Sequence, residues 1–412
     1  MSHEPVISRV LIVPGLPALA GNSLQNTHFQ SISLGLVLDG ARVVWGTYHP
    51  DSNDRAPLTT LQEKVVPLLN GRSLAAIREI MAELDGLTET AVITRPVPPP
   101  PPGSVSRRGF LTGNLAAEPE QEEVVVERPL SPSLRYCVSQ ALFTALAQAQ
   151  NVTVTECLAA TYNPAWQPAP IPLHLEIDAA DETPDTAVLS AHIQSIGYKI
   201  ASSNPAAQLG TNGERLQRFI RQLTTLIEQA TAPDYHPVIH LDVAGGLGQL
   251  LDNNAGRILG ALYGLEQAAR PYRLRVTDPA LLADLAQQIA FNRQLMDYMR
   301  MRGMQTELVN GRAGQSLADI TQLIAAGAAH WLELSPSRLG TVQQGIRAIQ
   351  ACQQAPIGVL LRDSSHPFAS HLALACQPDY IMVPWAANQP DNIDRVYREM
   401  IRTITFFTQI RA

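Results

Sequence analysis

The second half of the chain alternates short apolar runs with longer amphipathic segments. The run Val238–Leu241 is followed by Asp242 and then by the glycines Gly245 and Gly246. A short buried run that ends in a carboxylate and a glycine turn is typical of a parallel strand at the mouth of a β/α barrel. Runs of this kind predict eight strands, at Leu173–Ile177, Tyr198–Ala201, Val238–Asp242, Arg273–Thr277, Thr306–Val309, Trp331–Leu334, Gly358–Leu361 and Tyr380–Val383.

Segments with the 3.6-residue apolar period of a helix lie between these strands. The clearest are Gly213–Ala230, Asn254–Ala269, Leu281–Met301, Leu317–Ala325 and Val342–Cys352. Strand–helix alternation repeated about eight times favours a closed parallel barrel over an open sheet. We therefore expect an α/β protein in which residues 166–412 form a TIM-barrel-like (β/α) barrel.

Residues 1–165 have a different pattern, which predicts an N-terminal α+β capping domain. Apolar runs at Val10–Val13, Ile32–Leu38 and Val43–Gly46 predict strands, and Asp39-Gly40 between two of them is a strong hairpin signal. Residues 95–130 contain five consecutive prolines and then a stretch rich in glutamate. This composition predicts a surface insertion, part polyproline II and part disordered.

Composition excludes several classes of protein. The net charge of -7 over 412 residues gives no basic field for nucleic acid. No run of about 18 apolar residues predicts a membrane span, and the N-terminus lacks the pattern of a signal peptide. The four cysteines show no CxxC spacing, which is typical of buried thiols in a reducing cytosol. We expect a cytoplasmic protein that binds neither nucleic acid nor membranes.

Several segments of the chain resemble one family closely, methylaspartate ammonia-lyase (3-methylaspartase) of the enolase superfamily. The segments that carry the resemblance run nearly from end to end, and they are Pro14-Gly15-Leu16, Ile32–Leu38, Leu134–Ala141, Tyr162-Asn163-Pro164, Ile239–Val243, Leu274-Arg275-Val276, Glu307-Leu308-Val309 and Leu339-Gly340. The resemblance implies an α+β cap on a barrel, a homodimer, and the conversion of 3-methylaspartate to mesaconate and ammonia. The implied partner molecule is a small dicarboxylate or amino acid.

The resemblance also implies a Mg²⁺ ion that stabilises an enolate and is held by three carboxylates from successive strands. Asp242 matches the first of these ligands. The second falls on Thr277, with Asp278 one residue further, and the third falls on Gly311. A slip of one residue turns a strand side chain to the other face, so we expect Asp278 to point away unless a bulge intervenes. Only Asp242 is retained as a metal ligand.

The catalytic and substrate-binding positions implied by the resemblance are changed as well. The family's lysine base falls on Ser335, and its opposing histidine falls on Lys199, or on Tyr198 if the alignment slips by one residue. Two glutamines that bind the substrate fall on glutamates, and a Thr-Cys pair that grips a substrate carboxylate falls near two serines. The substrate-binding positions are thus Glu176, Glu333, Ser364 and Ser365. The two glutamates would repel a dicarboxylate.

Each of these residues also has a structural interpretation. Asp242 could cap the next helix in place of binding a metal. Lys199 could be a catalytic base, or it could form an ion pair with Glu176 or Glu333. His174 and His240 are expected to be hydrogen-bonded core histidines. Arg362, at the end of a predicted strand, could grip a small anion or could merely belong to a turn.

Three functions follow from this sequence. The first is a carbon–nitrogen lyase of the methylaspartate type that works with altered residues. The second is a non-catalytic paralogue that keeps the barrel as a structural or regulatory partner subunit. The third is an enzyme with different chemistry that uses Lys199 and Asp242 without a magnesium triad. Because a fold does not fix a function, the site decides among them.

Overall fold

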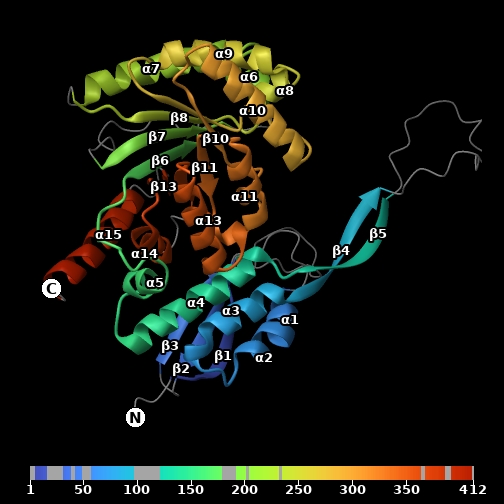
Figure 1. Cartoon of the computed structure of the whole chain (residues 1–412), viewed down its shortest axis with the longest axis vertical. Helices are drawn as coiled ribbons and strands as arrows, with labels where there is room; N and C mark the ends of the chain where they lie inside the picture. Colours follow the sequence, from blue (N-terminus) through green and yellow to red (C-terminus); the bar gives the residue numbers. More distant parts are fainter. Residues whose placement is uncertain are drawn as a thin grey trace, which may run out of the picture.

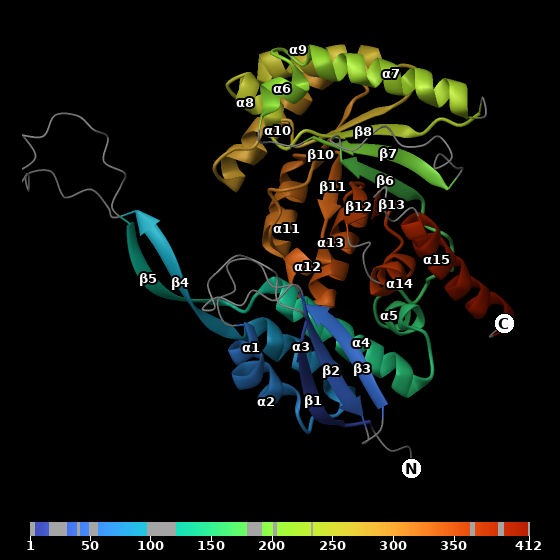
Figure 2. The same ribbon diagram turned by 180° about the vertical axis from the view of Figure 1, so that it is seen from behind.

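The computed structural model describes residues 5–15, 31–38, 42–48, 57–96, 121–178, 192–200, 204–231, 234–362, 367–385 and 391–410. Figure 1 shows a barrel surrounded by helices and, at one end of it, a smaller part built of a sheet and helices. In the reverse view of Figure 2, helices α14 (Pro367–Cys376) and α15 (Asp391–Ile410) lie side by side on the barrel.

The barrel has eight strands. They are β6 (Leu173–Asp178), β7 (Ile193–Lys199), β8 (Val238–Asp242), β9 (Leu274–Thr277), β10 (Glu307–Asn310), β11 (Trp331–Leu334), β12 (Gly358–Arg362) and β13 (Tyr380–Pro384). The sheet closes in the order β10-β11-β12-β13-β6-β7-β8-β9, and every neighbouring pair is parallel. This confirms the predicted parallel barrel.

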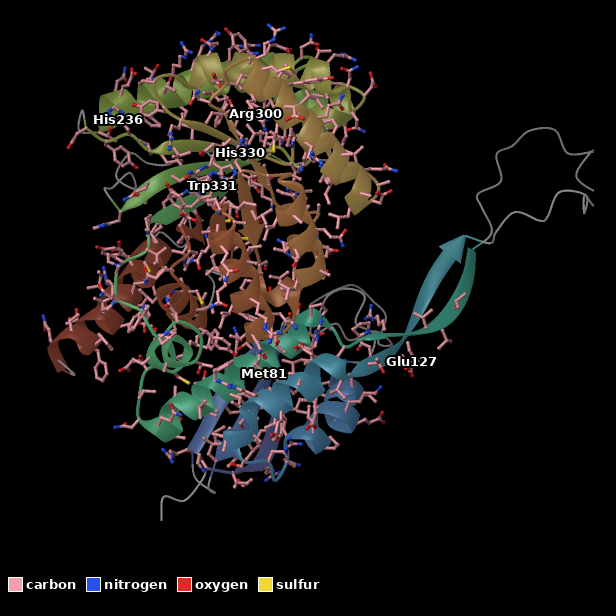
Figure 3. All side chains as sticks on the ribbon, viewed as in Figure 1. Met81, Glu127, His236, Arg300, His330 and Trp331 are labelled. Carbon is pink, nitrogen blue, oxygen red and sulfur yellow. The ribbon has the colours of Figure 1, made fainter. Side chains whose placement is uncertain are left out.

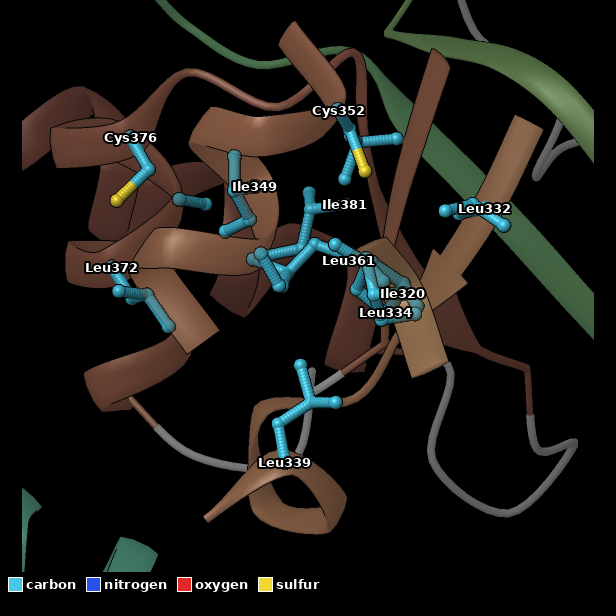
Figure 4. Packing of buried hydrophobic residues seen from close by; sticks show 14 of the residues in the cluster. Ile320, Leu332, Leu334, Leu339, Ile349, Cys352, Leu361, Leu372, Cys376 and Ile381 are labelled. Carbon is cyan, nitrogen blue, oxygen red and sulfur yellow. The ribbon is translucent and has the colours of Figure 1, made fainter. Parts of the chain in front are cut away.

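Helices cover the outer face of the barrel. They are α6 (Pro205–Leu209), α7 (Glu214–Ala230), α8 (Gly246–Leu250), α9 (Ala255–Ala269), α10 (Leu285–Met301), α11 (Leu317–Ala326), α12 (Pro336–Leu339), α13 (Val342–Gln354), α14 and α15. Alternate strand residues such as Leu334 and Leu361 pack outward against Ile349 and Cys352 of α13 (Figure 4). Among the helices of the described residues, none combines the length and apolarity needed to cross a bilayer.

Strand β7 begins well before the segment Tyr198–Ala201 that the sequence predicts. Its first residues, Ile193-Gln194-Ser195, lack a continuous apolar run, so periodicity does not reveal them. Ser195 is nevertheless buried, because its side chain points into the barrel and hydrogen-bonds His174. The polar residue belongs to the interior of the barrel, which is why the simple apolar pattern fails there.

Two buried histidines fill the middle of the barrel, as expected for core histidines. His174 Nδ1 lies 2.8 Å from Ser195 Oγ, and His240 Nε2 lies 2.6 Å from Thr277 Oγ1. The two imidazole rings are 4.8 Å apart. Burial lowers the pKa of His174 well below its usual value, and the charges of His240 and Arg275 act in the same direction. Burial also lowers the pKa of His240, to about 3.

An arginine closes the end of the barrel at which the strands begin. The guanidinium of Arg275 stacks 3.5 Å from the ring centroid of Trp331 and donates from Nε to Glu307 at 2.7 Å. Figure 3 labels Trp331 at the barrel strands. A Cβ at Gly358 would meet the Trp331 ring at 2.2 Å, so only glycine leaves room for the indole. Side chains fill this end of the barrel, so we expect a functional site at the opposite end, where the strands terminate.

The N-terminal part contains the predicted three-stranded meander. Its elements are β1 (Ile7–Pro14), β2 (Ile32–Leu38), β3 (Arg42–Tyr48), α1 (Pro57–Thr60), the π-helix η1 (Leu61–Val65), α2 (Val66–Leu69), the 3₁₀ helix η2 (Leu74–Ala76), α3 (Ile77–Gly86), α4 (Pro132–Gln150) and α5 (Val154–Tyr162). A Cβ at Gly46 would lie 2.3 Å from the Cys137 carbonyl oxygen, so glycine lets α4 approach β3 closely.

The turn Asp39-Gly40 lies outside the described residues. We retain the domain division between residues 165 and 166 as a proposal.

Part of the expected disordered insertion is a β-ribbon. Strands β4 (Thr88–Pro96) and β5 (Gln121–Pro129) pair antiparallel over their whole length. Figure 3 labels Glu127 on this ribbon, which projects from the body of the molecule. The expectation of disorder is therefore wrong for residues 121–129, where the β-branched run Val124-Val125-Val126 favours a strand. Residues 97–120, which contain the prolines, lie outside the described residues.

One carboxylate ties the N-terminal helices to the barrel. Asp85 of α3 accepts hydrogen bonds from Arg135 of α4 at 2.9 Å, from Thr341 at 3.2 Å and from Gln344 of α13 at 3.0 Å. A Cβ at Gly340 would lie 2.9 Å from the Arg135 guanidinium carbon, which explains the glycine before this junction. The contact fixes the loop that follows β11, where the family's base would stand.

The buried histidines predict how stability depends on pH. An unfolded histidine takes up a proton below about pH 6.5, whereas folded His174 stays neutral until far lower pH. The unfolded state then binds more protons, so the free energy of unfolding falls by about 1.4 kcal/mol per pH unit for each such histidine as the pH drops below about 6.5. Asn at position 174 can keep the bond to Ser195 without titrating.

The measurement is urea unfolding of wild type and His174→Asn between pH 7 and pH 5. Averaged over this range, the variant should show a slope of unfolding free energy against pH that is smaller by about 1 kcal/mol per pH unit, with the difference approaching about 1.4 kcal/mol per pH unit near pH 5. His236 is exposed, and His236→Asn is the matched control that should leave the slope unchanged. Equal slopes in wild type and His174→Asn would contradict the prediction.

Candidate functional site

The candidate site is the barrel mouth, formed by the C-terminal ends of the strands and the residues that follow them. Asp242 is the last residue of β8, Lys199 the last of β7, and Arg362 the last of β12. Glu176 on β6 and Glu333 on β11 lie near the same ends. In β/α barrels this end carries the active site.

Asp242 and Asp278 meet through one arginine. Arg312 Nη1 donates to Asp242 Oδ1 at 2.8 Å and to Asp278 Oδ2 at 2.9 Å, and its Nη2 donates to Asp242 Oδ2 at 2.8 Å. The side chains of Asp242 and Asp278 are only 7% and 2% exposed, so water does little to screen the three charges. The two carboxylates are thus held by a cation that belongs to the chain.

Asp278 reaches the mouth although it follows the inward-facing Thr277 directly. Its φ is +47°, so the chain leaves the extended conformation at this residue and turns the carboxylate towards Asp242. Asp278 Oδ1 also accepts a hydrogen bond from the Gly311 N–H at 3.0 Å. The expectation that Asp278 would point away is wrong, because a left-handed residue does here what a bulge would have done.

Asp242 does not cap the next helix through its side chain. Helix α8 begins after Gly245, which has φ of +80° and offers no side-chain cap. Asp242 Oδ1 instead accepts a hydrogen bond from the Ala244 N–H at 3.1 Å, within the turn. Its carboxylate therefore serves both the turn and Arg312.

The charges of this cluster are strongly coupled. Burial opposes the charge of Arg312, but hydrogen bonds and attraction from Asp242 and Asp278 outweigh it, so the pKa of Arg312 lies above its usual value. Burial raises the pKa of Asp278 to about 6, against the lowering effects of the Gly311 N–H and Arg312. Arg312 therefore remains a cation at every pH at which the protein is folded.

Arg362 holds the other pair of carboxylates. It donates to Glu176 from Nη1 at 2.7 Å and from Nη2 at 2.5 Å, and its Nε donates to Glu333. Arg338 on α12 lies 3.7 Å from the same Glu333 oxygen. Arg362 thus pairs with two glutamates of the chain itself, a role that differs from both alternatives raised by the sequence, a bound small anion or a turn.

Lys199 is separate from both clusters. By strand alternation it faces the same way as Ser195 and lies in register with Asp242, yet its side chain is exposed. Within the part of the chain that the structure describes, no hydrogen bond or ion pair is formed by its ammonium group. Among the described residues, Lys199 does not form the expected ion pair with Glu176 or Glu333, because both glutamates pair with Arg362.

The remaining candidates have other roles or cannot be placed. Tyr198 packs outward on Phe219 of α7, with ring centroids 4.8 Å apart, so it cannot replace Lys199 at the mouth. Ser335 precedes α12 and its Oγ lies 3.1 Å from Ser337 Oγ. Ser364 and Ser365 lie outside the described residues.

Sequence reasoning missed Arg312 and did not assign Arg362 to the glutamates. A signal for Arg312 was present, because Asp278 and Arg312 each stand one residue after a position to which the family resemblance assigns a metal ligand. The two displaced residues compensate each other in charge. Nothing in strand periodicity foretells the left-handed turn at Asp278 that makes their contact possible.

These residues do not fit a magnesium ion. Mg²⁺ requires oxygen ligands at about 2.0–2.1 Å in an octahedron, whereas the two available carboxylates are bonded to the guanidinium of Arg312. The position of a third carboxylate is Gly311, which has no side chain. Among the described residues, no group of three or more His, Cys, Asp or Glu is arranged to hold a metal.

The closed parallel barrel, with carboxylates at strand ends and an α+β part beside it, has the fold of solved methylaspartate ammonia-lyase and muconate cycloisomerase structures. The family model for the methylaspartate ammonia-lyase C-terminus matches residues 189–409, which is more than half of the chain. The chain therefore belongs to the methylaspartate ammonia-lyase family.

Individual relatives are distant but similar over nearly their whole length. Methylaspartate ammonia-lyase 2 of Carboxydothermus hydrogenoformans is 27% identical over 95% of this chain and 89% of its own. The Citrobacter amalonaticus methylaspartate ammonia-lyase structure containing (2S,3S)-3-methylaspartic acid has a TM-score of 0.75 at 19% identity, covering 98% of this chain and 100% of that one. The Mg complex of β-methylaspartase from Clostridium tetanomorphum has a TM-score of 0.71 at 19% identity, covering 97% and 98%. At this identity the solved structures show the fold.

Removing Arg312 should destabilise the protein, because two buried carboxylates lose their counter-ion. For Arg312→Met, which keeps an apolar stem, we expect a loss of about 3 kcal/mol in the free energy of unfolding, at the lower end of the range for breaking a buried pair. The loss stays low because Asp278, with its raised pKa, can take up a proton. Urea unfolding at pH 7.5 measures it.

The matched control is Arg300→Met, which breaks an exposed ion pair with Asp297 and should change stability by less than about 0.5 kcal/mol. Adding Asp242→Asn and Asp278→Asn to Arg312→Met should recover most of the loss, because no charge is then left unpaired. A loss in Arg312→Met no larger than in Arg300→Met would contradict the electrostatic role of Arg312.

Proposed function

We propose that this protein is a methylaspartate ammonia-lyase family member that does not carry out the Mg²⁺-dependent elimination of ammonia from 3-methylaspartate. The observation that carries the proposal is the contact of Arg312 with both Asp242 and Asp278. The carboxylates that a metal would need are satisfied by the chain itself. The barrel then serves as a non-catalytic scaffold, a structural or regulatory subunit.

The chemistry of the elimination supports this proposal. The proton removed from 3-methylaspartate lies next to a carboxylate and is weakly acidic, so the reaction needs a strong positive charge at the enolate and a positioned base. Relatives that carry the name of the lyase include one solved as a Mg complex and one containing 3-methylaspartic acid. In this chain a guanidinium takes the carboxylates, and Ser335 stands where the family base would be.

The second cluster supports the same conclusion for the substrate. Glu176 and Glu333 occupy positions where the family has neutral amides, and both are bonded to Arg362. A dicarboxylate that entered the mouth would meet four carboxylates whose cations are already engaged, and it would have to displace one of them. We infer that 3-methylaspartate binds weakly or not at all.

The direct test is incubation of purified protein with 3-methylaspartate and Mg²⁺ while the ultraviolet absorbance of mesaconate is followed. The expected result is no absorbance change above the buffer rate, with the Clostridium tetanomorphum enzyme as positive control under the same conditions. Turnover that requires Mg²⁺ and disappears in Asp242→Asn would overturn the proposal.

A homodimer and a cytoplasmic location are part of the same proposal. The homodimer follows from the family resemblance, and light scattering on the same preparation should give twice the chain mass, whereas a monomer mass would reject it. The location rests on four free cysteines, all buried, as expected in a reducing compartment. Cell fractionation tests the location.

A second candidate function is different chemistry based on Lys199. The observation that favours it is the exposed side chain of Lys199, which lies in register with Asp242 at the strand ends and forms no hydrogen bond or ion pair with the described residues. An amine of this kind can act as a base or form a Schiff base with a carbonyl substrate.

Trapping with sodium borohydride in the presence of small keto acids tests this candidate. A stable adduct on wild type that is lost in Lys199→Met, but kept in the surface variant Lys64→Met, would support it. Failure of every keto acid to label Lys199 above the level of Lys64 would remove the Schiff-base form of this candidate.

A further inference from the structure

The Arg312 cluster also bears on metal binding as such, independently of any reaction. Three hydrogen bonds of 2.8–2.9 Å join one guanidinium to three oxygens of Asp242 and Asp278. Oxygen–metal distances are about 2.0–2.1 Å for Mg²⁺ and 2.3–2.6 Å for Ca²⁺. A metal ion therefore cannot share these oxygens with Arg312 in place, since both would occupy the same space between the carboxylates.

Arg312 is well placed to exclude a metal ion. It is tethered to the same chain two residues after Asn310, and breaking its contacts would leave its charge in a half-buried position. A metal would in addition have to shed water from its own shell, and Mg²⁺ does so reluctantly. The guanidinium is only partly desolvated at this position and is already part of the chain, so we expect it to be favoured over a metal ion at ordinary metal concentrations.

Gly311 is the second feature that closes the position to metals. A Cβ built there would lie 2.9 Å from Thr277 Cγ2, 3.1 Å from Glu333 Oε2 and 3.2 Å from Asp278 Oδ2. A side chain at this residue would therefore enter the carboxylate cluster, and the Thr277 methyl group would have to shift by a few tenths of an ångström to admit it. The backbone of Gly311 is not in the left-handed region, so it can accept a side chain without backbone strain. An acidic residue there would supply the missing third carboxylate.

We propose that Arg312 is a built-in replacement for a divalent cation and that it keeps a latent metal site closed. Asp242 and Asp278 form two thirds of this site, and a carboxylate at residue 311 completes it. This inference shares its location with the proposed function, but it concerns binding alone. Its test needs no substrate and no turnover.

Mn²⁺ is the probe, because it accepts the oxygen ligands of Mg²⁺ and its free concentration is read by electron paramagnetic resonance. Four full-length proteins are titrated: wild type, Gly311→Asp, Arg312→Met and the double variant Gly311→Asp/Arg312→Met. We expect no saturable site in wild type or Gly311→Asp at millimolar Mn²⁺. The double variant should bind one Mn²⁺ per chain, at least about tenfold more tightly than wild type.

The single variants separate the two features that close the site. If Arg312 is the closing cation, Gly311→Asp alone must remain without metal although it has three carboxylates. Arg312→Met alone should bind more weakly than the double variant because it has only two. Adding Asp242→Asn to the double variant should abolish the site, and Arg300→Met should behave as wild type.

Thermal unfolding gives a second readout that also reports folding. Mg²⁺ at 10 mM should raise the Tm of the double variant by at least about 2 °C and leave that of wild type unchanged. If the double variant does not fold, the wild-type titration still decides. A wild-type protein that binds one Mn²⁺ per chain, and loses it in Asp242→Asn, overturns the inference.

The outcomes also separate this inference from the proposed function. Mesaconate formation by a wild-type protein that binds no Mn²⁺ would reject the proposed function and leave the closed metal site intact. Metal binding by wild type without turnover would reject the closed site and leave the absence of lyase activity intact.

Discussion

The structure of the barrel mouth depends on one nitrogen atom, Arg312 Nη1, which donates to two buried carboxylates at once. Two aspartates that are nearly excluded from water repel each other unless a positive charge lies between them. A metal ion is one way to supply that charge, and a guanidinium is another. In this chain the guanidinium of Arg312 supplies that charge, and the surrounding residues fit a guanidinium at this position.

The consequences extend around the barrel. Asp278 is in the left-handed conformation and turns to the mouth, whereas Thr277, one residue before it, hydrogen-bonds His240 inside the barrel. On the facing strands, Arg362 neutralises Glu176 and Glu333 in the same manner. The mouth therefore contains two neighbouring arginine–carboxylate clusters, one around Arg312 and one around Arg362. In each cluster the charges of the carboxylates are balanced within the chain.

Much of the fold could be predicted from the sequence, because buried parallel strands consist of short runs of apolar residues. Strands β8 and β11 begin and end where the pattern placed them, and Asp242 stands at its predicted strand end. Strand β7 was placed too late because its early residues face a polar barrel interior. Periodicity reports burial against apolar surroundings, and it says nothing about buried polar pairs.

The candidate site could be predicted only in part, for a physical reason. The family resemblance implied that two ligand positions fall on Thr277 and Gly311, but it did not reveal that the next residues, Asp278 and Arg312, pair with each other. That outcome depends on a backbone φ and on the reach of a long side chain across two strand ends.

The decisive measurement is a crystal structure of the wild-type protein grown with 10 mM Mg²⁺ and 3-methylaspartate. The account predicts the Arg312 guanidinium between Asp242 and Asp278 with no metal ion there, whereas a metal ion bound to both carboxylates, with Arg312 displaced, would contradict it.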